Sequence, residues 1–462
     1  MTMKTVNIYI ITLLTGFLCL QGCGEDHLDL EPISAIRDDV FYSTTEEIEV
    51  GVLAIYDGLQ QVPLREFALT EMRSDNTRTN LREGDWAQFE FLDVESTNVA
   101  VADYWSANYN VIFRANLILE NSDVVENETL RAQFNAEAKF ARAMSHFNLV
   151  RAYGDVPILD RVIGLGAEGE EYYDRDPATN VLEFVVDDLE DAVASLPSRG
   201  GIAEGRATNG AAKALLAKVY LTQDNYVDAE VLLSELVTDA NYALQENYND
   251  VFYNERNSEI IFAIQYRDDD AQESQDFSFE MTVDGVGSGL NYITDEFIAA
   301  LEPGDTIRSK TLFSEVDPLE VGKFITASSD ARLCGNDWIV LRLADVLLMH
   351  AEAIMAGAES TSDPRAIASY NAVRERAELP TLAPGGSEEL TKQMLLHERR
   401  VELAFENHRF YDLIRFDEAI NVLSAFAEDN GFAFSPNDLR LPIPQLEINV
   451  SNDKLKQNEG YN

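Results

Sequence analysis

The sequence predicts a mainly α-helical fold, in which tetratricopeptide-like helix pairs support an irregular, loop-rich face with a few short strands. Two observations lead to this prediction. Apolar residues recur at three- and four-residue spacing over most of the chain, which is typical of helices packed along one side. The segments between these stretches carry Gly, Pro, Asn and Asp without helical periodicity, which is typical of loops.

The first residues have the pattern of a bacterial lipoprotein signal peptide. Lys4 precedes an apolar run that ends at Leu20, and Cys23 stands where such a signal is cut and its cysteine acylated. The run is shorter than the roughly 20 apolar residues of a transmembrane helix. We therefore expect residues 1–22 to be removed, Cys23 to carry lipid and residues 23–462 to form one domain. An ordinary secretory signal or a short anchor is the alternative.

The chain is strongly acidic. It has 82 Asp and Glu against 35 Lys and Arg, a formal net charge of −47. Such a surface repels a polyanion, and no basic patch with interleaved aromatic residues is visible, so nucleic acid is not an expected partner. A solvated acidic surface suited to a saline medium explains the charge best, and a specific cationic ligand is the alternative.

Cysteine and histidine usage argues against a disulfide-stabilised protein and against a zinc-binding protein. After removal of the signal and lipidation of Cys23, Cys334 is the one thiol left, so no intramolecular disulfide is expected. The five histidines are scattered and form no cluster with zinc spacing, so we expect no metal site. Stability must then come from packing.

Helical periodicity begins near residue 46 with a stripe of Ile48, Val52, Ile55 and Leu59. The strongest further helices are expected over 98–121, 128–153, 178–196, 207–223, 225–239, 338–357, 362–378 and 388–427. Residues 207–239 predict an antiparallel pair, because small side chains such as Ala212 and Ala229 allow close approach. Residues 340–378 repeat the pattern, but the repeats are irregular and widely separated, so we expect no continuous solenoid.

The irregular segments are expected at about 70–97, 154–177, 241–337 and 428–462. Residues 259–266 are the clearest strand, and 283–292 form a glycine-rich loop. Long irregular segments on a helical scaffold are where binding residues usually lie.

Several separated blocks resemble one family, the RagB/SusD-like outer-membrane nutrient-binding lipoproteins. Their order and spacing agree over nearly the whole mature chain, which one short motif could not give. The blocks are 23–32, 103–109 running into 114–116, 205–216, 341–348 with 351–353, 398–413, 441–444 and 455–458.

The resemblance implies four tetratricopeptide-type helix pairs and a surface-exposed lipoprotein held at the outer membrane by its lipid. It also implies a partner, a SusC-like TonB-dependent transporter, on which the protein acts as a lid and to which it delivers a captured glycan. No cofactor and no catalysis are expected. An oligopeptide ligand, as in the RagB-type branch, is the alternative. A surface glycosidase is a remote one, since no catalytic motif was found.

The candidate ligand residues come from the first irregular segment and from the end of the glycine-rich loop. Trp86 lies in a polar, glycine-containing stretch with no apolar stripe to join, and a sugar offers C–H faces to an indole and hydroxyls to Asp, Asn and Arg. We expect contacts from Asp75, Asn76, Arg78, Trp86, Asn291 and Tyr292. A turn or capping role is the alternative for each, and anchoring of its own loop is a further alternative for Trp86. The 154–177 loop with Tyr172 and Tyr173 is the second choice of site.

The acidic C-terminal block has a structural explanation. Glu398, Glu402 and Glu406 recur every four residues, with Arg399 and Arg409 as expected partners, so a salt-bridged helix accounts for them without a substrate. Two tryptophans, Trp105 and Trp338, open or join apolar helical stripes and are expected in the core.

Overall fold

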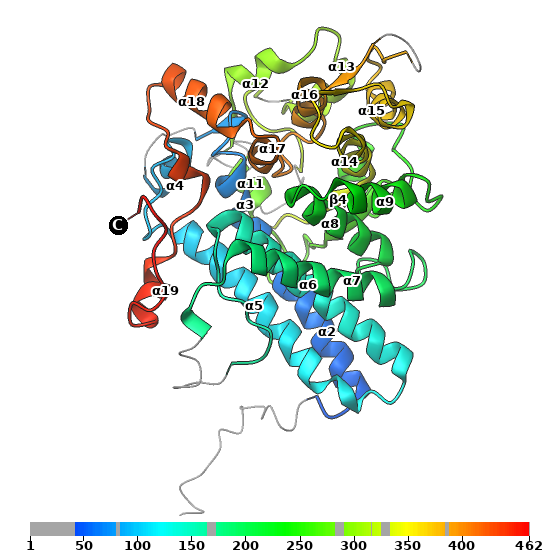
Figure 1. The fold of residues 1–462 in the computed structure, drawn as a ribbon, viewed down its shortest axis with the longest axis vertical. Helices are drawn as coiled ribbons and strands as arrows, with labels where there is room; N and C mark the ends of the chain where they lie inside the picture. Colours follow the sequence, from blue (N-terminus) through cyan, green and yellow to red (C-terminus); the bar gives the residue numbers. More distant parts are fainter. Residues whose placement is uncertain are drawn as a thin grey trace, which may run out of the picture. The chain divides into compact units, whose positions relative to one another are not determined.

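Long helices, stacked side by side, form the scaffold of the fold (Figure 1). In chain order they are α2 (Thr45–Leu59), α5 (Val99–Asn121), α6 (Glu128–Tyr153), α7 (Ala178–Ser195), α8 (Asn209–Thr222), α9 (Tyr226–Val237), α14 (Leu343–Met355) and α15 (Pro364–Arg376). Each packs against the next in this order. The prediction of no continuous solenoid is therefore wrong, because α14 packs directly against α9 and extends the array.

The computed structural model describes residues 42–79, 84–163, 172–281, 291–315, 317–324, 333–383 and 388–461. The expected signal segment and Cys23 lie outside these residues. Residues from Thr44 onward form one compact unit. Among the helices described, none combines the length and apolarity needed to span a membrane.

Side-chain caps explain where several scaffold helices begin. The Asn98 side chain accepts from the Ala100 amide at the start of α5, and Thr208 accepts from Ala211 at the start of α8. These contacts satisfy amides that have no partner within the helix. The predicted α8–α9 pair is confirmed, and Ala212 and Ala229 are fully buried.

A two-stranded sheet replaces the first turn of one predicted helix. The 338–357 segment begins as β4 (Trp338–Arg342), which pairs antiparallel with β2 (Ile260–Ile264) in the strand predicted over 259–266. An apolar run rich in β-branched residues suits either element, and pairing with β2 decides for the strand. Trp338 is buried, as expected, and so is Trp105.

The predicted helix over 388–427 is broken into separate elements. It forms β6 (Leu390–Thr391), α16 (Lys392–Glu402), α17 (Arg409–Arg415) and α18 (Ala419–Asn430), while β6 pairs with β5 (Ser360–Thr361). Between α16 and α17, Phe405 and Asn407 have φ of 65° and 64°. These left-handed residues end the helix and turn the chain.

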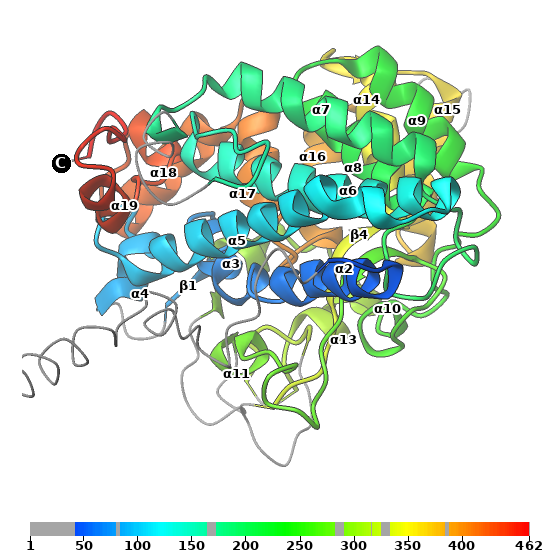
Figure 2. The same ribbon diagram turned by 90° about the horizontal axis from the view of Figure 1, so that it is seen from below.

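The irregular segments contain more helix than predicted. The first holds β1 (Thr77–Arg78) and α4 (Gly84–Glu90) after α3 (Pro63–Thr70). Residues 238–337 carry α10 (Asp250–Tyr253), α11 (Phe277–Met281), β3 (Tyr292–Ile293), α12 (Asp295–Ala300) and α13 (Thr306–Leu312). The chain closes with η4 (Pro436–Leu439) and α19 (Gln445–Val450). Figure 2 shows α11 and α13 on one side of α2, away from α7 and α9.

A buried ion network joins the C-terminal segment to strand β4 and helix α15. Glu402 and Glu406 accept from Arg342 at 2.6 and 2.7 Å, and Glu398 accepts from Arg374 at 2.8 Å. All three carboxylates are at most 3% exposed. The structural interpretation of this block is confirmed. The expected partners were wrong, since Arg399 pairs with Asp412 and Asp345 and Arg409 pairs with Asp75.

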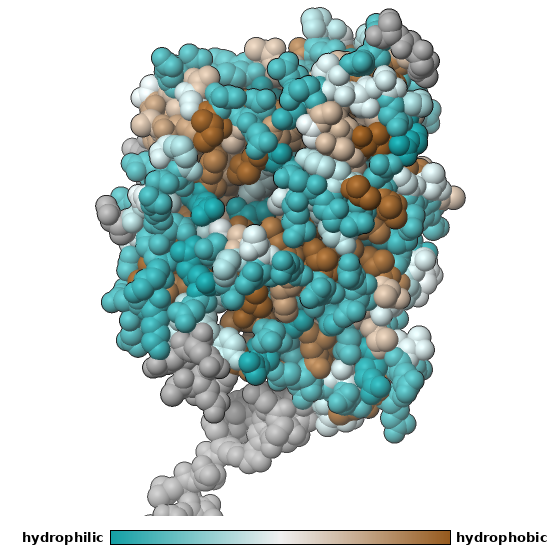
Figure 3. Space-filling view, in the orientation of Figure 1, coloured by the Kyte–Doolittle hydropathy of each residue, from teal (hydrophilic) through white to brown (hydrophobic). Residues whose placement is uncertain are grey.

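Figure 3 shows that hydrophilic residues cover most of the face viewed, and that apolar residues lie among them in small groups. Cys334 is buried and forms no disulfide within the described part of the chain.

Candidate ligand-binding face

Two segments more than 200 residues apart in sequence meet in a short antiparallel pair. Arg78 of β1 lies opposite Tyr292 of β3, and Thr77 lies opposite Ile293. The Thr294 hydroxyl donates to the Asp75 carbonyl at 2.8 Å and closes the junction. The structure thus places the two sets of predicted ligand residues side by side, and their contact with a ligand stays a prediction.

Asp75 and Asn76 lie beneath this pair and not on its surface. They are 5% and 0% exposed. Arg409 donates to Asp75 at 2.8 Å, and Arg400 lies 2.9 Å from the second carboxylate oxygen. Burial opposes ionisation, but Arg409 and Arg400 together lower the pKa of Asp75 to about 2.

Asn76 is bound on both sides of its amide. Its nitrogen donates to Glu71 at 3.2 Å, and its oxygen accepts from Arg400 at 2.9 Å. The predicted ligand residues Asp75 and Asn76 are therefore buried side chains that fix the backbone carrying β1. Their contact with a ligand stays an untested prediction. The sequence could not reveal the buried contacts, because Arg400 and Arg409 lie more than 300 residues away.

Trp86 lies on the short helix α4 and not in a loop. Its ring stacks on Phe67 at 5.7 Å between centroids, with an interplanar angle of 18°, and it also contacts Phe89. The expectation that it had no apolar partner is wrong. Because the indole is only half-buried, part of it remains accessible beside β1.

A buried carboxylate ties α4 to β1. Glu90 accepts from the Thr79 amide at 2.9 Å and from the Thr79 hydroxyl at 2.8 Å. Trp86 is therefore held on an element directly bonded to the strand that carries Arg78. We call the partly exposed side chains of Arg78, Trp86 and Tyr292 the ligand face.

The polar groups near the ligand face have spare hydrogen-bonding capacity. The Arg78 side chain is partly exposed opposite Tyr292. Asn291 is fully buried, and both its amide nitrogen and its oxygen lack a partner in the described part of the chain. Burial and the nearby Glu320 carboxylate raise the pKa of Tyr292, so its hydroxyl stays a neutral donor. An aromatic ring beside such groups matches the two surfaces of a sugar.

The second-choice loop is partly described. Val156 and Asp176 form an antiparallel bridge at its base, and the Arg161 guanidinium lies 5.3 Å from the Tyr172 ring centroid. Residues 164–171 lie outside the described residues. Within the described part of the chain, no group of three or more His, Cys, Asp or Glu side chains is arranged to hold a metal ion.

Comparison with known families identifies the class of protein. Residues 319–461 match the family described as "SusD family", and residues 26–221 match "Starch-binding associating with outer membrane". Together these matches span most of the chain. The protein belongs to the SusD-like family.

Full-length relatives agree with this assignment. SusD-like protein P38 of Formosa agariphila is 25% identical over 99% of this chain and 100% of its own length. A SusD-like protein of Bacteroides ovatus is 24% identical over 88% of this chain and 82% of its own.

Solved structures share the fold. A laminarin-binding SusD-like protein is 27% identical, with a TM-score of 0.75 over 90% of this chain and 100% of that one. Surface glycan-binding protein A from Bacteroides thetaiotaomicron, solved with laminarihexaose, is 22% identical, with a TM-score of 0.76 over 90% of this chain and 99% of that one.

Proposed function

We propose that this protein captures a glycan at the outer membrane and delivers it to a SusC-like TonB-dependent transporter without altering it chemically. Membership of the SusD-like family supports this, as does the 27% identity to a laminarin-binding protein. The observation that carries the proposal is the β1–β3 pair, which sets Arg78 and Tyr292 together beside the aromatic platform of α4.

Ligand binding is tested by calorimetric titration of the full-length protein in detergent. The ligands are laminarihexaose, a set of other oligosaccharides and a peptide pool. We expect saturable binding to at least one glycan, and about tenfold weaker binding for Arg78→Met, because a charged donor contributes roughly 1.5–3 kcal/mol. Arg365→Met, which removes an exposed arginine of α15, is the matched control. Binding of peptides alone would show the oligopeptide alternative to be correct.

Catalysis and delivery need separate experiments. Prolonged incubation with the bound glycan, labelled at its reducing end, should release no shorter product, and release would point to a glycosidase. Delivery predicts that a SusC-like transporter copurifies with the protein from outer membranes. Loss of glycan uptake on deletion of either protein should follow.

The lipid anchor at Cys23 is also part of the proposal. Stable anchoring takes more than one acyl chain. A Cys23 that carries two or more chains after removal of the signal would therefore hold the protein at the membrane. Cys23→Ala should move the protein from the outer-membrane fraction to the supernatant. Continued sedimentation with the membranes would contradict the anchor.

A further inference from the structure

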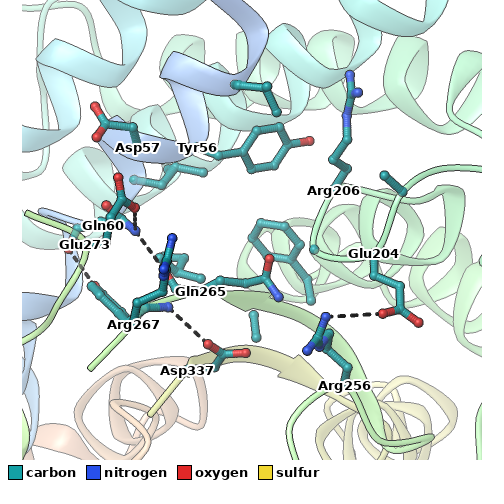
Figure 4. A pocket seen from close by; sticks show the side chains of 18 of the residues that line it. Tyr56, Asp57, Gln60, Glu204, Arg206, Arg256, Gln265, Arg267, Glu273 and Asp337 are labelled. Carbon is teal, nitrogen blue, oxygen red and sulfur yellow. Dashed lines mark hydrogen bonds and ion pairs between the residues drawn. The ribbon is translucent and has the colours of Figure 1, made fainter. Parts of the chain in front are cut away.

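A cavity lies between helix α2 and strand β2. None of its lining residues belongs to the ligand face. Its volume is about 920 Å³. Figure 4 shows Tyr56, Asp57 and Gln60 on the α2 side, Arg256 and Glu204 across the cavity, and Asp337 beside the strands. The cavity is large enough for a small organic molecule.

Two buried acceptors line this cavity without a hydrogen-bond donor. Gln60 is 8% exposed, and its amide nitrogen donates to the Gln265 carbonyl at 2.9 Å and to Glu273 at 3.0 Å. That arrangement leaves the Gln60 amide oxygen without a partner. Asp337 is 5% exposed, and one of its oxygens accepts from the Tyr266 amide at 3.1 Å while the other has no partner. Buried acceptors in this state are uncommon in folded proteins.

Around the cavity, some negatively charged side chains have no ion pair to balance them. Its arginines have acidic partners of their own, since Arg206 binds Glu137 and Glu49, Arg256 binds Glu204, and Arg267 binds Asp269. Arg256 and Gln265 also lower the pKa of Asp337, but their effect is smaller than that of burial. Three lining carboxylates, those of Glu255, Glu273 and Asp337, have no ion pair with any described cation. Burial and the Glu255 carboxylate raise the pKa of Asp337 to about 7. A positive charge placed here would meet an excess of acceptors and of negative charge.

The rest of the lining is apolar. Phe262 and Ile264 of β2 form part of one wall, and Leu53 of α2, which is 50% exposed, lies at the cavity with Val50. A bare metal ion does not suit such a wall, and no metal-binding cluster is present among the described residues. An aliphatic stem would cover the exposed carbon surface.

We propose that this cavity binds an organic cation, an ammonium or guanidinium group on an aliphatic stem. The cationic group donates to Asp337 and to the Gln60 amide oxygen, and the stem packs on Leu53 and Phe262. This site is independent of glycan capture at the ligand face.

The test compares two probes with the same four-carbon stem on the full-length protein. Nα-acetyl-lysine amide carries the ammonium group, and Nα-acetyl-norleucine amide carries the same stem without it. Ligand-observed NMR titration at pH 8 should show the lysine probe binding about tenfold or more tightly, as expected for charge-assisted hydrogen bonds. Nα-acetyl-arginine amide should compete for the same site.

Asp337→Asn locates the binding in this cavity. The asparagine oxygen can still accept from Tyr266, so the strand contact is kept while the charge is lost. We expect it to weaken the lysine probe at least about fivefold and to leave the norleucine probe unchanged. Asp123→Asn removes an equal charge from an exposed side chain of η2 (Ser122–Val124) and should bind like the wild type.

The proposal would be overturned by equal affinity for the two probes, or by unchanged binding of the lysine probe in a folded Asp337→Asn protein. Glucose serves as a third, uncharged probe. Binding of glucose that is lost in the Asp337→Asn protein would also overturn the proposal, because the cavity would then be a sugar site. Melting curves recorded for every variant separate loss of the site from loss of the fold. Laminarihexaose binding in the Asp337→Asn protein checks that the ligand face is intact.

Discussion

Trp86 has two structural roles at the scale of a single residue. One part of the indole stacks on the buried ring of Phe67 and so anchors α4, and the other part remains available at the ligand face. Substitution therefore affects both stability and binding, and the experiment has to separate them.

Trp86→Ala should lower the free energy of unfolding by about 1–3 kcal/mol, because a half-buried aromatic side chain and its stacking partner are lost. Glycan affinity should fall roughly tenfold when measured well below the melting temperature. Trp86→Phe, which can keep a ring on Phe67, should restore most of the stability. Unchanged affinity in a folded Trp86→Ala protein would remove the indole from the ligand face.

Asp337 gives a pH dependence whose sign follows from its burial. Its pKa is about 7 in the folded protein against 3.8 for an unperturbed carboxyl group, so the folded state holds the proton more tightly than the unfolded state. The resulting stabilisation is complete below pH 3.8 and is lost as the pH rises through about 7. Between pH 6 and pH 8 the unfolding free energy should fall by about 1 kcal/mol from this group.

Asp337→Asn should remove this component. Chemical denaturation at several pH values, in wild type and variant, measures it as the difference between the two curves. Parallel curves between pH 6 and pH 8 would show that Asp337 ionises as easily in the folded protein as in the unfolded chain.

At the scale of elements, the long helices were predictable and their interruptions were not. Each of the segments predicted at 98–121, 128–153, 207–223 and 225–239 has a clear apolar period, and the helices there begin within two residues of the predicted positions. The turn at 403–408 has no glycine or proline to mark it, yet Phe405 adopts a left-handed conformation that is uncommon for a residue other than glycine.

The same limit applies to the candidate site. Proximity of the first irregular segment to residues 291–292 was anticipated, but the roles of Asp75 and Asn76 depended on distant arginines. A polar run such as 73–80 looks alike whether its side chains face a ligand or a buried guanidinium. Only the three-dimensional partner distinguishes the two cases.

The α8–α9 pair gives a prediction at this scale. Ala212 and Ala229 are fully buried, so Ala212→Leu or Ala229→Leu should overpack the interior at a cost of about 1–3 kcal/mol. A lower melting temperature with unchanged glycan affinity is the expected outcome. If binding were lost at unchanged melting temperature, this pair would be part of a site and not of the scaffold.

At the scale of the whole molecule, Arg342 joins segments from distant parts of the sequence. It donates to Glu259 at the start of the β2 region, to Glu402 at the end of α16 and to Glu406 in the following turn. The residue is 1% exposed. Removing one member of such a group leaves buried charges without a partner.

Arg342→Met should therefore destabilise the protein by about 3–5 kcal/mol. Arg365→Met, which breaks exposed ion pairs with Glu230 and Asp363, should have little effect. Thermal and urea unfolding of both variants tests the comparison. Similar losses in the two would mean that the buried network contributes no more than surface charge pairs.

The continuity of the helical array also sets an order of events during biosynthesis. Helix α9 ends at Val237, yet the helix that packs on it begins at Leu343, with Ser234 and His350 in contact at 3.1 Å. A chain synthesised from its N-terminus therefore exposes the unfinished end of the array until the intervening segment has emerged. Closing so long a loop slows folding and leaves apolar surface open to aggregation or chaperones in the meantime. The inserted region that carries part of the ligand face is thus also the interval during which the nascent protein is most vulnerable.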